Sequence, residues 1–357
     1  MKEYSVIGLM SGTSLDGLDI AYCTFKSNKG KWQYSIKCAE TIKYSKEWFQ
    51  KLKEAHHYGG EKLLQIHSEY GEFLGKKVLD FIRKNKLITI DLVSSHGHTV
   101  FHNPENGFTF QLGNGASLAA TCGITSVCDF RILDVALKGQ GAPLVPIGDR
   151  LLFPEYDFCL NLGGFSNISY EVKGNRIAFD ICPVNTALNY LAETRGKAFD
   201  RGGAIAKSGR INKELLVKLN KLDYYQKKKS KSLGREWLQK YFLPVLNSSN
   251  ISIEDKLATV TEHIAYQISQ VILSVDKKGK ILITGGGAKN SFLILKLKEK
   301  LRGSQIIIPE QSLVDFKEAL VFAFLGILRM EQKINTLCSV TGASKDSSGG
   351  VVFISGK

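Results

Sequence analysis

A short segment near the N-terminus combines hydroxyl side chains, glycines and two carboxylates. It reads Ser11-Gly-Thr-Ser-Leu-Asp-Gly-Leu-Asp19 and follows the apolar run Tyr4-Ser-Val-Ile-Gly-Leu9. Glycines let backbone N–H groups converge, and hydroxyls add donors, so the segment can hold phosphate oxygens. Asp16 and Asp19 would repel phosphate, but carboxylate oxygens suit Mg²⁺. The lysine of a P-loop is missing, so an ordinary hairpin turn is the alternative.

Two later segments repeat this pattern of a strand-like run followed by glycines. They are Asn161-Leu-Gly-Gly164 and Thr284-Gly-Gly-Gly-Ala288. A glycine turn after a strand is how α/β folds present loops that bind ligands. One phosphate hairpin in each half, with a late glycine loop against a nucleoside, is typical of the actin-like sugar kinase superfamily. The three segments together predict a nucleotide site.

Asp180 is the candidate general base. It closes the strand-like run Arg176-Ile-Ala-Phe-Asp180 and precedes Ile181-Cys-Pro-Val-Asn185 and a predicted helix. A carboxylate at the carboxyl end of a strand can project toward a ligand and accept a proton from a nucleophile. The alternative is that Asp180 caps the following helix, a role for which Asn185 competes.

A histidine-rich segment and an arginine predict a rim that contacts substrate. The segment Ser95-His-Gly-His-Thr-Val-Phe-His102 could bind zinc, but no cysteine or carboxylate cluster lies beside it. We therefore expect His96 and His98 to form hydrogen bonds with substrate. Asp129 and Arg131 follow another strand-like run, and the guanidinium fork matches a carboxylate or a phosphate. A structural salt bridge is the alternative for Arg131.

Hydrophobic periodicity predicts the elements that position these residues. Helical stripes cover 61–84, 257–275 and 318–329, the last expected as a buried helix between domains. The predicted strands are 18–25, 33–42, 91–95, 124–128, 157–162, 166–171, 176–180, 280–284 and 304–308. A β-meander gives way to αβ alternation, and this order recurs after residue 155. The fold class is therefore α/β, with one duplicated unit in each half and a cleft between them.

The glycine- and proline-containing stretch Lys138-Gly-Gln-Gly-Ala-Pro-Leu-Val-Pro146 is the predicted domain boundary. It suits an interdomain crossing or a loop that lines the cleft, and a mere linker is the alternative. Gln140 amid small residues favours contact with a ligand. We expect an N-terminal domain of residues 1–137, joined by the tail 337–357, and a C-terminal domain of residues 138–336.

Composition places the 357-residue chain among ordinary globular proteins. Net charge is +14, which suits nucleic acid or anionic small substrates. No nucleic-acid-binding signature accompanies the densest basic run, Lys227–Ser232, so we expect a solvated loop and no nucleic-acid partner. Seven scattered cysteines without CxxC favour reduced thiols in a cytoplasm. No apolar run approaches the roughly 18 residues of a membrane span, and we expect no signal peptide and no membrane partner.

Nine motifs in order closely resemble those of the anhydro-N-acetylmuramic acid kinases, across nearly the whole chain. They are Met10–Asp19, Ser95–Thr99, Asp129–Arg131, Gly139–Pro146, Asn161–Gly164, Lys231–Glu236, Thr284–Ala288, Lys317–Leu320 and Ser339–Ala343. The resemblance implies a two-domain actin-like (ribonuclease H-like) sugar kinase fold with an interdomain cleft. It also implies a cytoplasmic enzyme of cell-wall recycling, with a homodimer as the expected oligomeric state.

The same resemblance implies an activity and its residues. The family uses ATP to phosphorylate O6 of 1,6-anhydro-N-acetylmuramic acid while water opens the anhydro ring, and Asp180 matches the base. The residues expected to bind ATP are Ser11, Gly12, Thr13, Ser14, Leu15, Asp16, Gly17, Leu18, Asp19, Gly163, Gly164, Gly285, Gly286 and Gly287. Those expected to bind the sugar are His96, His98, Asp129, Arg131, Gln140, Asn185 and Glu318, with Asp16 and Asp19 as candidate Mg²⁺ ligands.

Departures from the family pattern gather among residues assigned to the sugar. Asp180-Ile-Cys-Pro-Val-Asn185 stands where the family usually has Asp-Thr-Gly-Pro-Gly-Asn. His98 replaces a glutamine, Asn114 an aspartate, and Arg201 a small or acidic residue. Two alternatives follow: a kinase of the same fold for another sugar or anhydrosugar, or a nucleotide-binding regulator that has lost turnover.

Overall fold

The computed structural model describes residues 2–12, 15–226, 232–276 and 278–355. Their contacts divide the chain into two compact units, Met1–Leu152 with Phe316–Lys357, and Phe153–Asp315. The basic run expected as a solvated loop falls largely on residues 227–231, which lie outside the described residues, as do Thr13 and Ser14.

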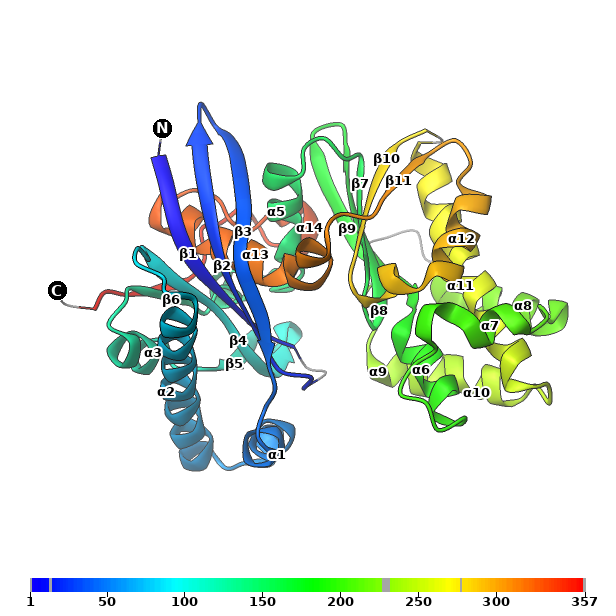
Figure 1. The fold of residues 1–357 in the computed structure, drawn as a ribbon, viewed down its shortest axis with the longest axis horizontal. Coiled ribbons are helices and arrows are strands. Elements are labelled where there is room, and N and C mark those ends of the chain that lie inside the picture. The colour runs from blue at the N-terminus through cyan, green and yellow to red at the C-terminus, as the bar shows by residue number, and fades with distance from the viewer. Residues whose placement is uncertain (1, 13–14, 227–231, 277, 356–357) are drawn as a thin grey trace. The chain divides into compact units, whose positions relative to one another are not determined.

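A seven-stranded sheet forms the first unit, in the order β12-β6-β4-β1-β2-β3, with β5 paired to β4 (Figure 1). The strands are β1 (Lys2–Ser11), β2 (Leu18–Asn28), β3 (Lys31–Ile42), β4 (Leu92–Asn103), β5 (Phe108–Leu112), β6 (Ser126–Cys128) and β12 (Val351–Phe353). β1, β2 and β3 form an antiparallel meander, and β4 and β6 continue the sheet in parallel from β1.

Helices cover both faces of this sheet. They are α1 (Lys46–Glu54), α2 (Gly60–Asn85), α3 (Gly115–Cys122), α4 (Ile132–Ala136), α5 (Val145–Leu152), α13 (Gln311–Met330) and α14 (Cys338–Thr341). On one face, Ile7 and Leu9 of β1 are buried in one core with Ile66 and Leu74 of α2. On the other face, α13 approaches β1 so closely that a Cβ on Gly8 would collide with the Ala319 carbonyl oxygen.

The second unit repeats the topology with five strands, in the order β11-β10-β7-β8-β9. They are β7 (Phe158–Leu162), β8 (Phe165–Val172), β9 (Asn175–Pro183), β10 (Lys280–Thr284) and β11 (Gln305–Ile307). Again three strands form an antiparallel meander, and two more run parallel to the first of them. This shared order confirms the predicted duplicated α/β unit of the actin-like, ribonuclease H-like fold.

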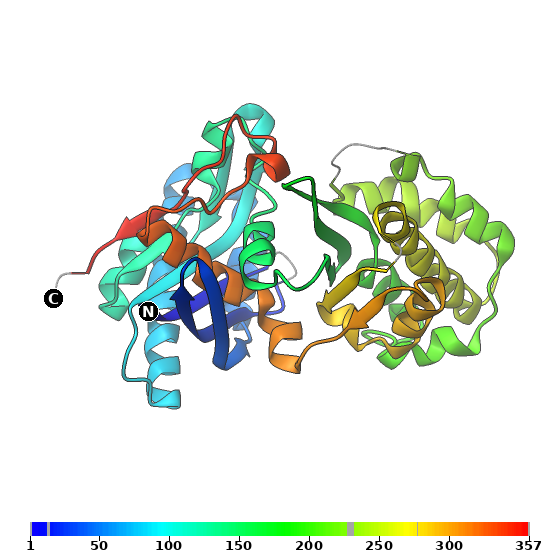
Figure 2. The same cartoon turned by 90° about the horizontal axis from the view of Figure 1, so that it is seen from above.

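The helices of the second unit gather on one side of its sheet (Figure 2). They are α6 (Asn185–Glu193), α7 (Ala204–Ser208), α8 (Lys213–Asn220), α9 (Arg235–Trp237), α10 (Leu243–Asn247), α11 (Ile253–Val275) and α12 (Ser291–Lys300), with a π-helical turn, Leu238–Phe242, between α9 and α10. The apolar stripe of α11 is buried in the core that also contains Leu160 of β7 and Ile281 of β10. Burial of that stripe is what makes the predicted 257–275 periodicity a stable helix.

The unit boundaries differ from the predicted residues 137 and 336. The loop 138–146 lies inside the first unit, because the following helix α5 packs against α13, where Gly148 abuts Val321. A buried ion pair of 2.7 Å between Lys317 and Asp149 joins the same two helices. The predicted helix 318–329 belongs to the first unit, and the chain crosses into it at Phe316, whose φ of −117° and ψ of 18° break α13.

One strand also differs in a way that matters for the site. The predicted strand 91–95 continues to Asn103, so the histidines lie within β4 rather than beyond its end. The pairing with β1 shifts at this point: Leu9 faces Ser95, but Ser11 faces His98. β4 therefore bulges at His96 and Gly97, where Gly97 has a φ of +71°. A bulge re-aims the side chains beside it.

Candidate functional site

In the first unit, the side chain of Ser11 is buried and forms hydrogen bonds with two other side chains. Its side chain is 2% exposed, and its Oγ lies 3.0 Å from Nδ1 of His98 and 2.7 Å from the hydroxyl of Tyr44. Tyr44 in turn lies 2.7 Å from the hydroxyl of Tyr70 on α2. The Ser11 hydroxyl thus belongs to a buried network, which leaves the backbone that follows as the part able to meet a phosphate.

The segment after Ser11 turns tightly. The backbone N–H of Leu15 donates to the Gly12 carbonyl at 3.2 Å, and Leu15 has a φ of +63°. A Cβ on Gly17 would lie 2.7 Å from the Ile42 carbonyl oxygen, so the backbone of β3 leaves room only for glycine. Leu18 is buried in the sheet, which fixes where the turn ends. In the described part of the turn, Asp16 is exposed.

Asp19 and Glu318 are the carboxylates of the first unit that influence each other. The Thr41 hydroxyl donates to Asp19 at 2.5 Å. Glu318 has an exposed surface, but many protein atoms surround its carboxyl group. Desolvation by these atoms, followed by the charge of Asp19, raises the pKa of Glu318. Oxygen ligands of this kind fit Mg²⁺. No cluster of three or more histidine, cysteine, aspartate or glutamate side chains suited to a metal occurs among the described residues, so other ligands would have to complete the coordination.

Arg131 is locked by its neighbours. Its Nε and Nη2 donate to Nε2 of His96 at 3.0 and 2.9 Å, and its Nη1 donates to the Gly141 carbonyl at 2.7 Å. Burial lowers the pKa of Arg131 to about 10, still well above neutral pH. The guanidinium is therefore cationic and fixed in one orientation, as recognition of an anion or a sugar oxygen requires.

His96 faces Arg131 rather than open space. It is 5% exposed, and its Nδ1 lies 2.9 Å from the Gly97 carbonyl oxygen. Burial, followed by the Arg131 charge, holds the pKa of His96 well below its usual range, so the ring is neutral. Nδ1–H then donates to Gly97, and Nε2 accepts from Arg131. Both nitrogens are thereby engaged, which fits a role in orienting Arg131 better than the predicted direct contact with substrate.

The loop around Gln140 is anchored by Asp134. This carboxylate is fully buried and accepts from the Gly141 N–H and from the Thr341 hydroxyl, each at 2.7 Å. Gln140 itself is exposed. Asp129 follows β6 with a φ of +58° and accepts a hydrogen bond from the Cys128 thiol at 3.1 Å. The first unit thus joins Arg131 to His96 and, through the Gly141 carbonyl, to the loop that contains Gln140.

In the second unit, the glycine segments converge with the start of α6. The Asn185 amide donates to the Leu162 carbonyl at 3.1 Å, and its N–H donates to the Gly163 carbonyl at 3.2 Å. A Cβ on Gly285, which has a φ of +82°, would collide with Oδ1 of Asn161. A Cβ on Gly287 would lie 2.7 Å from the Leu162 Cβ. Two predicted loops, 161–164 and 284–288, therefore form one compact backbone surface with Asn185.

Asp180 sits next to this surface in the sheet. It pairs with Asn167 of β8, which pairs with Asn161 of β7. Its Oδ2 accepts from the Leu233 N–H at 2.8 Å and the Ser232 hydroxyl at 3.3 Å. Burial raises the pKa of Asp180, and these two donors oppose that shift. Oδ1 accepts no hydrogen bond from any residue that the structure describes. Asp180 does not cap α6, because the N-cap position of that helix is Val184.

The altered residues beside Asp180 face the core. Cys182 and Val184 are fully buried, and neither needs a left-handed backbone. β9 bulges there, because Ser166 faces Cys182 while Asn167 faces Asp180, which leaves Ile181 unpaired. Ser166 fixes the bulge by accepting from the Cys182 N–H at 3.2 Å. The loop therefore reaches its geometry without the family's glycines.

Several residues at these sites carried no signal as candidates. Ser232 and Leu233 belong to the motif Lys231–Glu236, but nothing local indicated that they reach Asp180. Asp134, Tyr44 and Tyr70 lie outside every motif described above. Their partners are far away in the sequence, and only long-range pairing reveals them.

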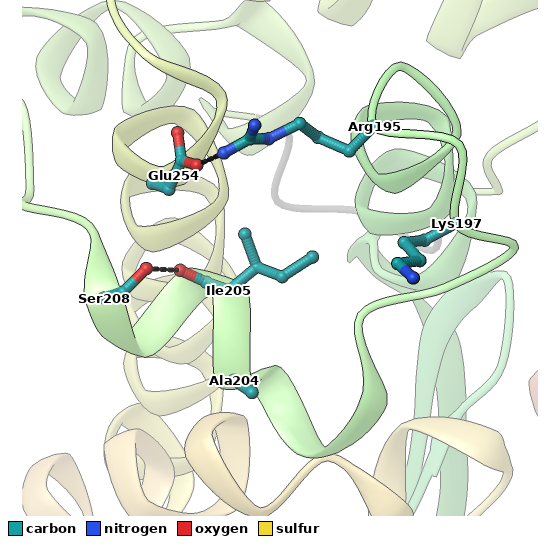
Figure 3. Close-up of a pocket in the computed structure, with 6 residues that line it drawn as sticks. All are labelled: Arg195, Lys197, Ala204, Ile205, Ser208 and Glu254. Carbon is teal, nitrogen blue, oxygen red and sulfur yellow. Dashed lines mark hydrogen bonds and ion pairs between the residues drawn. The ribbon is translucent and has the colours of Figure 1, made fainter.

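A surface pocket of about 420 Å³ in the second unit contains none of the predicted site residues (Figure 3). It is lined by Arg195, Lys197, Ala204, Ile205, Ser208 and Glu254. Arg195 pairs with Glu254, and the Ser208 hydroxyl donates to the Ile205 carbonyl at 2.8 Å. The glycine loops and Asp180 lie outside this pocket, and we assign the site to them. Within the described ranges, no helix has the length and apolar character to cross a membrane.

Comparison with known proteins supplies the family. The model of the anhydro-N-acetylmuramic acid kinase family matches residues 4–355. Anhydro-N-acetylmuramic acid kinase of Caldanaerobacter subterraneus subsp. tengcongensis is 34% identical over 375 residues, which cover 96% of this chain and 95% of the relative. The enzyme of the same name from Mannheimia succiniciproducens is 34% identical over 377 residues and 99% of each chain.

Solved structures resemble the chain more distantly. The (R)-2-hydroxyglutaryl-CoA dehydratase component A of Acidaminococcus fermentans superposes with a TM-score of 0.46 at 14% identity, covering 90% of this chain and 96% of that one. A likeness at this level supports no argument about function. The full-length match of the family model and of the relatives does: the chain belongs to the anhydro-N-acetylmuramic acid kinase family.

Proposed function

We propose that the protein uses ATP to phosphorylate O6 of 1,6-anhydro-N-acetylmuramic acid while water opens the anhydro ring. The products are N-acetylmuramic acid 6-phosphate and ADP, and the reaction serves recycling of the cell wall. The observation that carries the proposal is the setting of Asp180, whose Oδ2 is held by Leu233 and Ser232 while Oδ1 has no donor among the described residues.

Asp180 acts as the general base. Oδ1 takes a proton from water as the water oxygen bonds to the anomeric carbon, and the bond from that carbon to O6 breaks. O6 then accepts the γ-phosphoryl group, and ADP leaves. Burial raises the pKa of Asp180, which makes its carboxylate a better base. The donors on Oδ2 keep the carboxylate in one orientation.

Binding of ATP is assigned to backbone. In the first unit, Gly12 to Gly17 offers N–H groups to phosphate oxygens, and in the second, Gly163, Gly164 and Gly285 to Gly287 let a nucleotide approach the main chain. Mg²⁺, when bound, neutralises charge on the phosphates. Asp19 is the ligand we favour for it, directly or through water, with Asp16 as the second candidate.

Recognition of the sugar is assigned to the first unit and to Asn185. Arg131, oriented by His96, offers its remaining N–H groups to a carboxylate or sugar oxygen, and Glu318 and Gln140 offer polar groups. The lactyl carboxylate of the muramic acid is the group that an arginine fork matches.

The structure weighs against a different sugar. Cys182 and Val184 differ from the family pattern, but both are fully buried in the core of the second unit, so their side chains do not contact a ligand. The substitutions change packing behind Asp180 and leave the carboxylate in place. We therefore favour the family's own substrate over another anhydrosugar.

The test is an ADP-release assay with ATP, Mg²⁺ and 1,6-anhydro-N-acetylmuramic acid. We expect ADP and a 6-phosphosugar in equal amounts. ADP release only with another sugar would point to a different kinase, and ATP binding without turnover on any anhydrosugar would point to a regulator. A cytoplasmic homodimer is the proposed state of the protein, and sedimentation of the purified chain tests its oligomeric part.

A further inference from the structure

Four polar groups from four separate segments form a continuous chain behind the start of the phosphate-binding turn. Nδ1 of His98 lies 3.0 Å from Oγ of Ser11, which lies 2.7 Å from the Tyr44 hydroxyl, which lies 2.7 Å from the Tyr70 hydroxyl. His98 belongs to β4, Ser11 ends β1, Tyr44 precedes α1, and Tyr70 lies on α2. The network therefore ties the turn to three other elements of its unit.

The direction of these hydrogen bonds follows from burial. Tyr70 is fully buried, and its hydroxyl lies 2.7 Å from that of Tyr44, so the Tyr70 O–H can donate to Tyr44. A buried O–H without an acceptor costs more free energy than an ordinary hydrogen bond contributes. Tyr44 can then donate to Ser11, and Ser11 to His98. This order gives each of the three hydroxyl protons an acceptor within the protein.

We propose that His98 is a positioning residue whose neutral Nδ1 is the terminal acceptor of this chain and thereby fixes Ser11 at the entrance of the phosphate-binding turn. His98 then carries its proton on Nε2, and it does not contact the sugar through Nδ1. The inference rests on the proposed binding of ATP phosphate by the turn. It replaces a direct substrate contact with an indirect role in placing the backbone at Ser11 and Gly12.

Substitutions at His98 separate the acceptor from the ring. In His98→Gln, a side-chain carbonyl oxygen can still accept from Ser11, whereas His98→Leu has no acceptor. We expect His98→Leu to weaken ATP binding about fivefold, the scale of one lost hydrogen bond, and His98→Gln to restore most of that affinity. Tyr44→Phe removes the middle hydroxyl with less change in shape, and we expect it to weaken ATP binding in the same direction.

Two measurements on the full chain test the proposal. Nitrogen chemical shifts of His98 report which ring nitrogen carries the proton, and we expect it on Nε2. Calorimetry gives the Kd for Mg²⁺–ATP in the unchanged protein and in each variant that keeps its circular dichroism spectrum. A proton on Nδ1, or equal Kd values for His98→Leu and His98→Gln, would overturn the proposal. Neither measurement needs sugar turnover, so a failed ADP-release assay would count against the proposed function alone.

Discussion

At the scale of single residues, the second unit holds its candidate base by two donors from one distant segment. Asp180 and Ser232 are 52 positions apart, and Leu233 follows directly. Both donors act on Oδ2, so the orientation of the carboxylate and its proton affinity depend on the same contacts. Loss of the carboxylate and loss of a donor should therefore have different kinetic signatures.

Asp180→Asn should lower kcat by at least about 10²-fold, the scale of a lost general base. The amide keeps the shape but takes no proton from water, and binding of ATP should be retained. Steady-state kinetics and calorimetry measure the two effects. Asp223→Asn, at an exposed carboxylate of the same unit, is the matched control and should turn over normally. Near-normal turnover of Asp180→Asn would remove this residue from the base role.

Ser232→Ala should move the acid limb of the kcat profile to higher pH. The Ser232 hydroxyl stabilises the ionised form of Asp180, so its loss raises the pKa of that carboxyl further. When the pH is lowered, Asp180 of the variant therefore becomes protonated, and turnover falls, at a higher pH than in the unchanged protein. Turnover measured across pH checks this, with Ser248→Ala as control, since the Ser248 hydroxyl donates to Val245 instead. An unchanged limb would mean that this hydrogen bond does not tune the base.

At the scale of elements, glycine matters where two backbones approach each other. Gly285 connects β10 to the turn that precedes α12, and it needs both a φ of +82° and the space beside Asn161. Gly174, in the hairpin between β8 and β9, has a φ of +81° but nothing within 4 Å of a Cβ. Substitutions at Gly174 and Gly285 therefore distinguish the free-energy cost of a left-handed backbone from the added cost of a steric collision.

Gly174→Ala should lower the free energy of unfolding by about 1–2 kcal/mol, the cost of a left-handed backbone for a residue with a Cβ. Gly285→Ala should cost more than that and should also weaken ATP binding, because the new Cβ displaces Asn161 from the glycine surface. Urea unfolding and calorimetry measure these effects. Equal losses of stability in the two variants would show that the loops do not need the close approach.

At the scale of the whole molecule, both units bury neutral histidines. Burial lowers the pKa of His98 to about 4 and that of His263 to about 3, and it holds the pKa of His96 well below its usual range. His96 and His98 belong to the first unit and His263 to the second. In the unfolded chain these rings titrate near pH 6.5. Between the unfolded and folded pKa values, the unfolded state binds more protons.

The protein should therefore lose stability as pH falls below about 6.5, with the His98 contribution complete near pH 4. At pH 5 that single group should account for about 2 kcal/mol. Thermal unfolding at pH 7.5 and pH 5 measures the loss. His98→Gln cannot titrate, so its Tm should fall less over the same interval. An identical decline in both proteins would mean that His98 is already protonated, or exposed, in the folded state.

Sequence alone determined the parts whose evidence is local. Alternation and helical periodicity gave the nine predicted strands and the helices now seen as α2, α11 and α13, because a half-buried element must repeat its apolar side chains with its own period. The order of those elements was enough for the duplicated α/β unit. The glycine segments were recognisable for the same reason, since close backbone approach excludes other residues.

Tertiary structure decided which residues meet. The bulge in β4 turned His96 toward Arg131 and placed His98 beside Ser11, whereas a strand ending at residue 95 would have left both in a loop. Ser232 donates to Asp180 although the two residues are 52 positions apart in the sequence. The first segment of the first unit ends at Leu152 rather than at the predicted residue 137, because α5 packs on α13. These outcomes depend on pairing between distant segments, whose energies come from burial and hydrogen bonding that no local pattern encodes.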